Sequence, residues 1–248
     1  MKKTFPYQNT IDNQNKASQN ISNEKMQNSQ LAFSKIFSFW KDLTPSQAAF
    51  LENSARSETF KPGMLIHRSS GDCKGVMAVI SGGLRVYCVS EEGREVTLYR
   101  VESGEVCVLS ASCLMDSLVF DVVIESLGQT KVCLLPSPAL HKIEEENPLV
   151  SLYIYKNATE KFSEVLWTIQ QVLFLKIDQR IANFLHDESL RQKSRTLSIT
   201  HEEIAKEIGS VREVVTKTLK YMEENGYVSL GRGKIEISDK GKLESFLK

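Results

Sequence analysis

The chain lacks several features that would place it quickly in a class of proteins. It has no run of about 18 apolar residues, so no segment is long enough to span a bilayer as a helix. The N-terminal residues Met1-Lys2-Lys3 lead into polar sequence, without the apolar core of a secretory signal. Its five cysteines, an odd number without the spacing of a disulfide scaffold, are typical of a reducing compartment. We therefore expect a soluble, cytoplasmic protein with no membrane partner.

A net charge and familiar catalytic motifs are also missing. The 31 Lys and Arg residues balance 31 Asp and Glu residues, which excludes a globally basic nucleic-acid coat protein but not a local basic patch. No G-x-S-x-G sequence, Walker loop or H-E-x-x-H motif occurs, and the four His residues form no visible triad. Cys107 and Cys113 lack the companion pair that a zinc site needs. We expect no catalytic residues, no enzyme activity and no metal site.

Four segments of different character are present, and together they predict an α+β fold. In residues 1–30, Asn, Gln and Ser supply 14 of the 30 residues, so too little apolar surface is available to offset the entropy of ordering. We interpret this segment as a disordered extension. Residues 31–146 begin with a helical stretch, residues 31–60, and continue as short strands. Residues 147–175 form a long helix and a hinge, and residues 176–248 form a second unit whose first helix is expected to end near residue 187.

The strand-rich part has turn residues at short intervals. Gly82-Gly83 and Glu92-Gly93 fall between apolar runs, where hairpin turns favour residues that tolerate positive φ. Many short strands at such spacing indicate an antiparallel sandwich or barrel. The predicted strands cover residues 64–67, 76–81, 84–89, 96–101, 119–126 and 131–135.

The long helix begins at Asn147-Pro148, a capping residue followed by proline in the first turn. Its apolar residues recur at helical spacing over about 25 residues, nearly twice the ordinary length. One interpretation is a core helix that lies across the barrel, and the other is the coiled-coil seam of a homodimer. We favour the seam, because one small barrel cannot cover a helix of this length. The seam residues would be Phe162, Val165, Leu166, Ile169, Val172 and Leu173.

The strongest local signal lies between residues 200 and 215. Thr200 precedes Glu203 by three residues, and Ser210 precedes Glu213 by three, so each pair has the spacing of a capping box. The glycine at 209 would make a short turn between the two helices, which is helix–turn–helix spacing. A hairpin at 227–237 would follow as a wing. The shared core would be Ile204, Ala205, Ile208, Val214 and Leu219.

The second of these helices would present a polar face to DNA. Arg212 has the geometry to bind guanine in bidentate fashion, Glu213 to accept from cytosine N4, and Lys217 to contact guanine or phosphate. Arg232 and Lys234 in the wing would clamp phosphates. The alternative is a solvated helix face with ordinary charges. The predicted DNA-binding residues are Thr200, Ser210, Arg212, Glu213, Thr216, Lys217, Lys220, Arg232 and Lys234.

These features together resemble the cyclic-AMP receptor protein/FNR (Crp/Fnr) family of bacterial transcription regulators, over about residues 35–248. The resemblance rests on the glycine-punctuated strands, the long helix, the hinge Phe174-Leu175 before Arg180-Ile181-Ala182, and the helix beginning Arg212-Glu213. It implies an N-terminal antiparallel β-roll, a cyclic-nucleotide-binding-like jelly roll, that controls a C-terminal winged helix–turn–helix. It also implies a homodimer on a pseudo-palindromic operator in double-stranded DNA, and RNA polymerase as a partner.

The effector region departs from the nucleotide-binding branch of that family. Gly104-Glu105 stands where the family's phosphate cassette begins, but no Lys or Arg occurs from residue 101 to residue 130. A buried cyclic phosphate would therefore have no cationic partner, which is costly. Val165 and Leu166 replace the hydroxyl residues that read the base. The expected effector pocket comprises Gly104, Glu105, Cys107, Ser110, Cys113, Val165 and Leu166.

The predicted function is thus a homodimeric, sequence-specific DNA-binding regulator whose DNA affinity depends on an effector or on redox state. The cofactor is left unnamed. Cys107 and Cys113 are candidate redox sensors if a helix N-terminus lowers a thiol pKa, or else small buried packing residues. Two alternatives remain: a β-roll module that reports a ligand to a protein partner, and a cyclic-nucleotide-responsive regulator.

Overall fold

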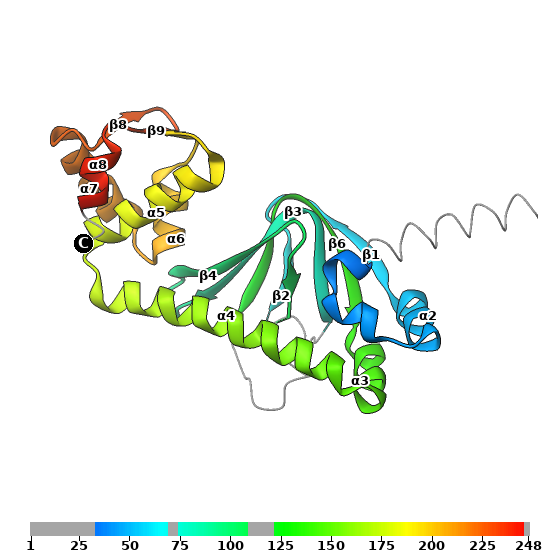
Figure 1. The fold of residues 1–248 in the computed structure, drawn as a ribbon. Coiled ribbons are helices and arrows are strands. Elements are labelled where there is room, and N and C mark those ends of the chain that lie inside the picture. Colours follow the sequence, from blue (N-terminus) through cyan, green and yellow to red (C-terminus); the bar gives the residue numbers. More distant parts are fainter. Residues whose placement is uncertain (1–32, 69–73, 109–121, 246–248) are drawn as a thin grey trace, which may run out of the picture.

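The computed structural model describes residues 33–68, 74–108 and 122–245, and all structural statements refer to those ranges. The predicted extension at 1–30, together with Ser110 and Cys113, lies outside the described residues. Two separate hydrophobic cores are present, one built from residues between 33 and 165 and the other from residues between 181 and 243. A long helix runs under the first unit and leads to the second at its far end (Figure 1). Among the described residues, no helix is long and apolar enough to cross a membrane.

The first unit opens with an aromatic cluster and two short helices. Phe33 stacks on Trp40 with ring centroids 4.9 Å apart, and Phe37 lies against both rings. The second helix begins after Thr44, which forms a capping box with Gln47 as the spacing of these two residues favours. The helices are η1 (Ser38–Asp42) and α2 (Pro45–Ser54).

An antiparallel sheet forms the body of the first unit, in agreement with the strand pattern of the sequence. The strand order is β1-β6-β3-β4, with β2 also paired to β6 and β5 to β3. Its inner residues make the larger core. The strands are β1 (Arg56–Phe60), β2 (Leu65–Arg68), β3 (Gly75–Val89), β4 (Glu95–Glu102), β5 (Val106–Cys107) and β6 (Val123–Pro136).

The hairpin predicted at Gly82-Gly83 is wrong, because β3 runs through both glycines as one strand of 15 residues. Two register shifts against β6 absorb them as a local irregularity. Gly82 has φ of +79°, and a Cβ there would come within 2.5 Å of the Gln129 carbonyl oxygen. The Thr130 hydroxyl donates to the Gly83 carbonyl at 2.9 Å. These glycines therefore allow a close strand approach, whereas the turn predicted at Glu92-Gly93 is confirmed between β3 and β4.

Two further predictions in this unit need correction. The helical interpretation of residues up to 60 is wrong at its end, since β1 pairs with β6 from Arg56 to Phe60. The two strands predicted around residues 119–135 are a single strand, β6, over its described part. Helix α3 (Ser137–Glu146) follows β6 directly and was not predicted, because its proline-rich start gave no helical periodicity.

The long helix α4 (Pro148–Phe174) has 27 residues and begins where the sequence predicted. The Asn147 side chain caps it by accepting from the Leu149 amide at 3.1 Å. One face packs on the first core through Val150, Ile154 and Ala158. Val165 is also in this core, at 6% exposure, so it does not belong to the predicted seam. The other seam residues are exposed in the single chain: Phe162, Leu166, Ile169, Val172 and Leu173.

The second unit combines helices with a small sheet of order β7-β9-β8. Helix α5 was predicted to end near residue 187 but extends to Gln192, where Lys193 takes a left-handed conformation with φ of +50°. The two helices and the hairpin expected after it are present. The elements are α5 (Ile177–Gln192), β7 (Thr196–Leu197), α6 (His201–Ile208), α7 (Arg212–Glu224), β8 (Val228–Gly231), β9 (Lys234–Ile237) and α8 (Lys240–Glu244).

Candidate nucleic-acid interface

Helix α6 has both of the end signals found in the sequence. At its start, the Thr200 hydroxyl accepts from the Glu203 amide at 3.2 Å, and a Glu203 carboxylate oxygen accepts from the Thr200 amide at 2.7 Å. At its end, Gly209 adopts a left-handed conformation with φ of +68°, which ends the helix and turns the chain. The Ser210 amide donates back to the Ala205 carbonyl at 2.9 Å. The short turn fixes α6 against α7.

The capping box predicted at Ser210 and Glu213 does not form. The residue in extended conformation just before α7 is Val211, and no side chain caps that helix. Glu213 is therefore the second helical residue rather than the third, where a capping box needs it. Ser210 is half-buried in the turn.

The predicted core of the second unit is correct except at Val214. Ile204, Ala205 and Ile208 of α6 are buried against Leu219 of α7, but Val214 is 42% exposed. Val215 takes the inward position in its place, four residues before Leu219 on the same helix face.

The polar face of α7 faces solvent near its N-terminus. Arg212, Glu213, Lys217 and Lys220 are exposed, and Thr216 is half-buried. His201 of α6 holds Thr216, since its Nδ1 lies 2.9 Å from the Thr216 hydroxyl. The structure thus brings the predicted reading residues together on one helix face.

The wing lies beside the start of α7. Arg232 and Gly233 form its exposed turn between Gly231 and Lys234, which pair across the hairpin. A cavity of about 390 Å³ lies between the wing and the starts of α6 and α7. Thr200, Arg212 and Lys234 line this cavity from three different elements. A phosphate or base edge placed there would meet two cationic side chains.

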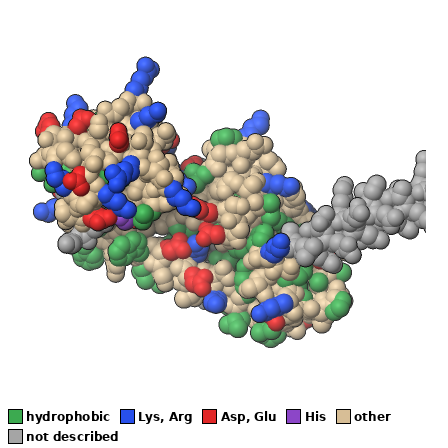
Figure 2. All heavy atoms as spheres, turned by 45° about the horizontal axis from the view of Figure 1, so that its top comes forward, with side chains coloured by type: hydrophobic (Ala, Val, Ile, Leu, Met, Phe, Trp, Pro, Cys, Tyr) green, Lys and Arg blue, Asp and Glu red, His purple; other side chains and the backbone are tan. Residues whose placement is uncertain are grey.

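The charge of the second unit is only weakly basic, with 14 Lys and Arg against 12 Asp and Glu in residues 176–248. Figure 2 shows Lys and Arg side chains spread over the outer surface of this unit, with acidic side chains among them and where the two units meet. A positive potential at α7 and the wing would therefore have to come from the local placement of Arg and Lys rather than from net charge.

A network of ion pairs between the two units was not predicted from the sequence. Arg85 of β3 is 3% exposed and contacts Glu95 at 2.6 Å and Glu125 at 3.0 Å. Its Nη2 also donates to the Lys206 carbonyl of α6 at 3.2 Å. Although burial alone would raise the pKa of Glu95, its hydrogen bond to Arg85 holds that pKa below the ordinary value.

Arg100 of β4 extends the network to α5 and α6. It contacts Glu188 at 3.2 Å and Glu207 at 2.7 Å. A second close approach joins the units where the Val96 side chain packs on Gly209, since a Cβ on that glycine would lie 2.5 Å from Val96 Cγ2. The face of α6 opposite its own core therefore rests on β4.

The expected effector residues lie in different environments. Gly104 is in the exposed turn between β4 and β5, and a Glu105 carboxylate oxygen accepts from the Glu102 amide at 2.8 Å. Cys107 is 0% exposed and lies in strand β5. Val165 is in the core, whereas Leu166 is exposed on α4.

Comparison with known proteins gives a consistent result over most of the chain. A sequence family described as the Crp-like helix-turn-helix domain matches residues 179–246. The transcriptional activator protein anr of Pseudomonas aeruginosa is 26% identical over 200 residues, covering 76% of this chain and 79% of that protein. The transcriptional regulator SdrP of Thermus thermophilus is 28% identical over 170 residues, covering 65% and 78%.

A solved structure matches more closely in sequence. It is the crystal structure of a protein from Eubacterium rectale described as a transcriptional regulator of the crp/fnr family. That protein is 39% identical to this chain, with a TM-score of 0.81, and the match covers 85% of this chain and 98% of the other.

Proposed function

This chain belongs to the Crp/Fnr family of DNA-binding transcription regulators, and from that premise we propose that it reads a pseudo-palindromic operator as a homodimer. Helix α7 would enter the major groove, and the wing would hold the adjacent phosphates. The observation that carries the proposal is the single exposed face on which Arg212, Glu213 and Lys217 stand beside Lys234 of the wing.

Within that face, the side chains have different proposed roles. Arg212 is in the first turn of α7, where a recognition helix contacts base edges, and its guanidinium suits the O6 and N7 atoms of guanine. Glu213 would accept from cytosine N4. Lys217 and Lys220, farther along α7, and Arg232 and Lys234 of the wing would neutralise phosphates, which sets register without reading sequence. Thr200 and Ser210, at the start of α6 and in the turn, would add hydroxyl contacts to the backbone.

We also propose the exposed face of α4 as the dimer seam. An apolar stripe on α4 is left exposed by the described residues: Phe162, Leu166, Ile169, Val172 and Leu173. A stripe of this kind at helical spacing is stabilised when an identical helix buries it. Two copies of α7 would then face the same side of a duplex, as a palindromic operator requires.

Control of DNA affinity is proposed to come from the first unit, because Arg85 of β3 and Arg100 of β4 both form ion pairs with Glu207 of α6. Cys107 is an unsuitable redox sensor in this arrangement, because oxidants reach exposed thiolates and Cys107 is buried in a strand. Cys113 remains a prediction outside the described residues. The family likeness supports RNA polymerase as a further proposed partner.

Selection from random double-stranded DNA with the full-length protein tests the proposal. The expected result is an enriched sequence with two inverted half-sites, centred about 10 base pairs or a multiple apart. A mobility shift with the selected duplex would show one protein dimer bound. Failure to enrich any sequence would overturn the proposal and favour the alternative of a β-roll module that signals to a protein partner.

The cyclic-nucleotide alternative has its own test. The sequence from residue 101 to residue 130 contains neither Lys nor Arg, so this segment offers no cationic side chain to a cyclic phosphate. A buried phosphate without a counterion loses several kcal/mol, which takes micromolar affinity to about millimolar or weaker. Calorimetry with cAMP is therefore expected to show no binding at micromolar concentrations, and a micromolar dissociation constant would contradict this prediction.

A further inference from the structure

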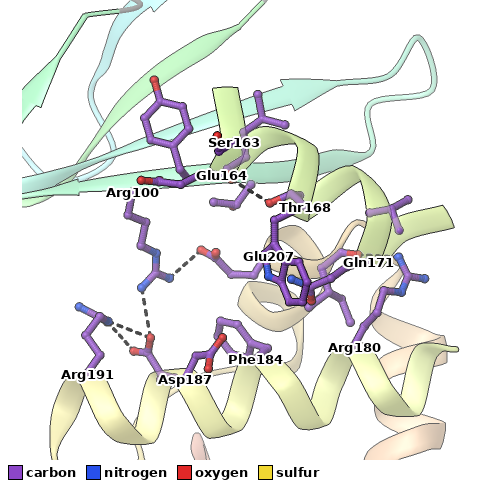
Figure 3. Close-up of a pocket in the computed structure, with 17 residues that line it drawn as sticks. Arg100, Ser163, Glu164, Thr168, Gln171, Arg180, Phe184, Asp187, Arg191 and Glu207 are labelled. Carbon is purple, nitrogen blue, oxygen red and sulfur yellow. Dashed lines mark hydrogen bonds and ion pairs between the residues drawn. The ribbon is translucent and has the colours of Figure 1, made fainter. Parts of the chain in front are cut away.

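A cavity of about 580 Å³ lies at the junction of the two units, apart from the proposed DNA-reading face formed by α7 and the wing. Residues of β4 and α4 line it on one side, and residues of α5 and α6 line it on the other (Figure 3). Its volume lies within the range of about 300–1,000 Å³ that is usual for small-molecule sites. Whatever occupies it touches both units at once.

The walls of this cavity include large apolar side chains. Leu98 of β4, Trp167 and Val172 of α4, and Phe184 and Ile208 from the second unit contribute to its lining. Trp167, which is not among the seam residues, is 58% exposed, so the described residues leave this surface in contact with water. A flat apolar ligand body would remove that surface from water, which is favourable.

The cationic side chains of the lining differ in whether they have a carboxylate partner. Arg100 contacts Glu188 and Glu207, and Arg191 contacts Glu188 and Glu102. Arg180 contacts no carboxylate of the described residues, and it lies apart from that cluster in Figure 3. A charged group at the cavity edge is therefore left without a counterion.

The hydrogen bonds of Arg180 lead to the same conclusion. Its Nη1 donates to the Ile208 carbonyl at 2.8 Å, and within the described residues its buried Nε has no acceptor. Burial lowers the pKa of this guanidinium, and no neighbouring carboxylate opposes the effect. An anion in the cavity beside Arg180 would supply the missing counterion to the guanidinium.

We propose that this cavity binds a small organic anion with a flat apolar body, its acidic group on Arg180 and its rings against Trp167 and Phe184. Because its walls come from both units, the ligand favours the arrangement in which α6 rests on β4. The binding site stands independently of how the protein reads DNA. The coupling to DNA affinity rests on the function proposed above.

Calorimetry on the full-length protein with two matched probes tests the site. The probes are 2-naphthoate, a flat aromatic carboxylate, and 2-naphthamide, which has the same shape without the charge. We expect 2-naphthoate to bind about tenfold or more tightly, because only the carboxylate forms a charge-assisted pair. Equal affinity of the two probes, or no heat from 2-naphthoate at millimolar concentrations, would overturn the proposal without any variant being needed.

Variants then locate the bound probe. Arg180→Gln should remove the preference for 2-naphthoate over 2-naphthamide, and Phe184→Ala should weaken both probes. Arg195→Gln is the matched control, because Arg195 is an exposed arginine of the same unit that does not line the cavity. Thermal unfolding verifies that each variant is folded. An unchanged preference in folded Arg180→Gln contradicts the assignment.

The coupling is measured with the duplex obtained by selection. We expect saturating 2-naphthoate to change the affinity for that duplex severalfold in wild type and not in Arg180→Gln. If 2-naphthoate binds while DNA affinity is unchanged, the proposed coupling to DNA binding is contradicted, whereas the proposed binding site is supported. If no duplex is ever bound while 2-naphthoate binds through Arg180, the proposed DNA function has failed and the site has not.

Discussion

The side chains of the proposed DNA-reading face, on α7 and the wing, are expected to contribute to DNA binding in different ways. Arg212 is in the first turn of α7 and Lys234 is in the wing, and both line the 390 Å³ cavity. A bidentate contact to guanine discriminates between base pairs, whereas a phosphate contact releases counterions from any sequence. The two residues are both cationic, so only the sequence and salt dependence of binding tells their roles apart.

Arg212→Ala is expected to cost about 1–3 kcal/mol on the selected operator and to relax the preference at one guanine per half-site. Lys234→Ala should weaken binding evenly across sequences and reduce the salt slope by about one unit. Fluorescence anisotropy on the operator and on single-base variants, at several salt concentrations, measures both. Equal losses for Arg212→Ala on every duplex would show that Arg212 is not a base reader.

His201 should make the stability of the second unit depend on pH. Burial, and then the charge of Arg212, hold the pKa of this histidine below 6.5. The unfolded chain therefore binds more protons as the pH falls below about 6.5, and stability decreases from there towards the lower folded pKa. His201→Gln, which stays neutral and can still bond to Thr216, should lose this dependence.

Chemical denaturation at about pH 7.5 and about pH 5.5 compares these proteins. His141→Gln is the control, because His141 is an exposed histidine on α3 in the first unit. If wild type and His201→Gln lose the same stability between the two pH values, His201 is not responsible.

At the scale of elements, the two faces of α4 differ in burial. One face is buried on the sheet through Val150, Ile154 and Val165, and the opposite face is apolar and exposed. Apolar side chains on the second face do not stabilise the single chain, because they stay in contact with water. Their burial against a partner surface would be favourable. The periodicity of α4 thus belongs to a core helix on one side, and on the other side it agrees with the seam that we propose.

Ile169→Glu should separate the dimer without unfolding the chain, because Ile169 is exposed in the single chain. A carboxylate in the seam would be desolvated next to its copy, which costs about 3 kcal/mol, or roughly a hundredfold in the dimer dissociation constant. Multi-angle light scattering measures the mass. Gln170→Glu adds the same charge one position along the helix and serves as the control.

A monomer of Ile169→Glu that also loses operator affinity is the expected result. An unchanged dimer would place the homodimer contact elsewhere on the molecule. A monomer with undiminished operator affinity would contradict the link between the seam and DNA reading.

The elements that the sequence predicted well are those with local signals. Helix α6 has its capping residue Thr200 at one end and Gly209 at the other, and α4 has Asn147 before a proline. The hairpin prediction at Gly82-Gly83 failed because a glycine pair looks the same in the sequence of a hairpin turn as in a strand that closely approaches its neighbour. Only the position of Thr130 across the sheet distinguishes the two.

Residues that act through a partner far along the chain could not be predicted. Arg85 meets Glu207 across 122 positions of sequence, and no periodicity links them. The sequence indicated Arg180 only as part of the family resemblance at Arg180-Ile181-Ala182. Neither the cavity that it lines nor its missing counterion can be read from the order of residues. The DNA-reading face was predictable because its residues lie on one helix and one adjacent hairpin.

At the scale of the whole molecule, the relation between the two units depends on a polar contact. The two hydrophobic cores are separate, so burial of apolar surface stabilises each unit by itself. Among the described residues, the contacts that join them besides the hinge after α4 include the packing of α6 on β4 with its ion pairs to Arg85 and Arg100, and the ion pairs of α5 with β4. Such pairs are largely shielded from water and fix geometry more than they add stability.

Arg100→Gln should therefore loosen the second unit while leaving both cores folded. It removes charge-assisted contacts to Glu188 and Glu207, worth about 1 kcal/mol or more, which raises the undocked population roughly fivefold. The exposed Lys176, between α4 and α5, becomes more available to trypsin in the undocked form, so its cleavage should accelerate by a similar factor.

Arg94→Gln is the control for this last experiment, because Arg94 pairs only with exposed Glu92 in the turn of the same hairpin and its loss also removes one tryptic site. Wild type and Arg94→Gln should be cleaved at Lys176 at similar rates, and Arg100→Gln faster. If all three proteins are cut equally fast, the Arg100 ion pairs do not hold the units together. In that case the Arg85 contacts to α6 and the packing of Val96 on Gly209 would have to position α6, and control of DNA affinity could not run through Arg100.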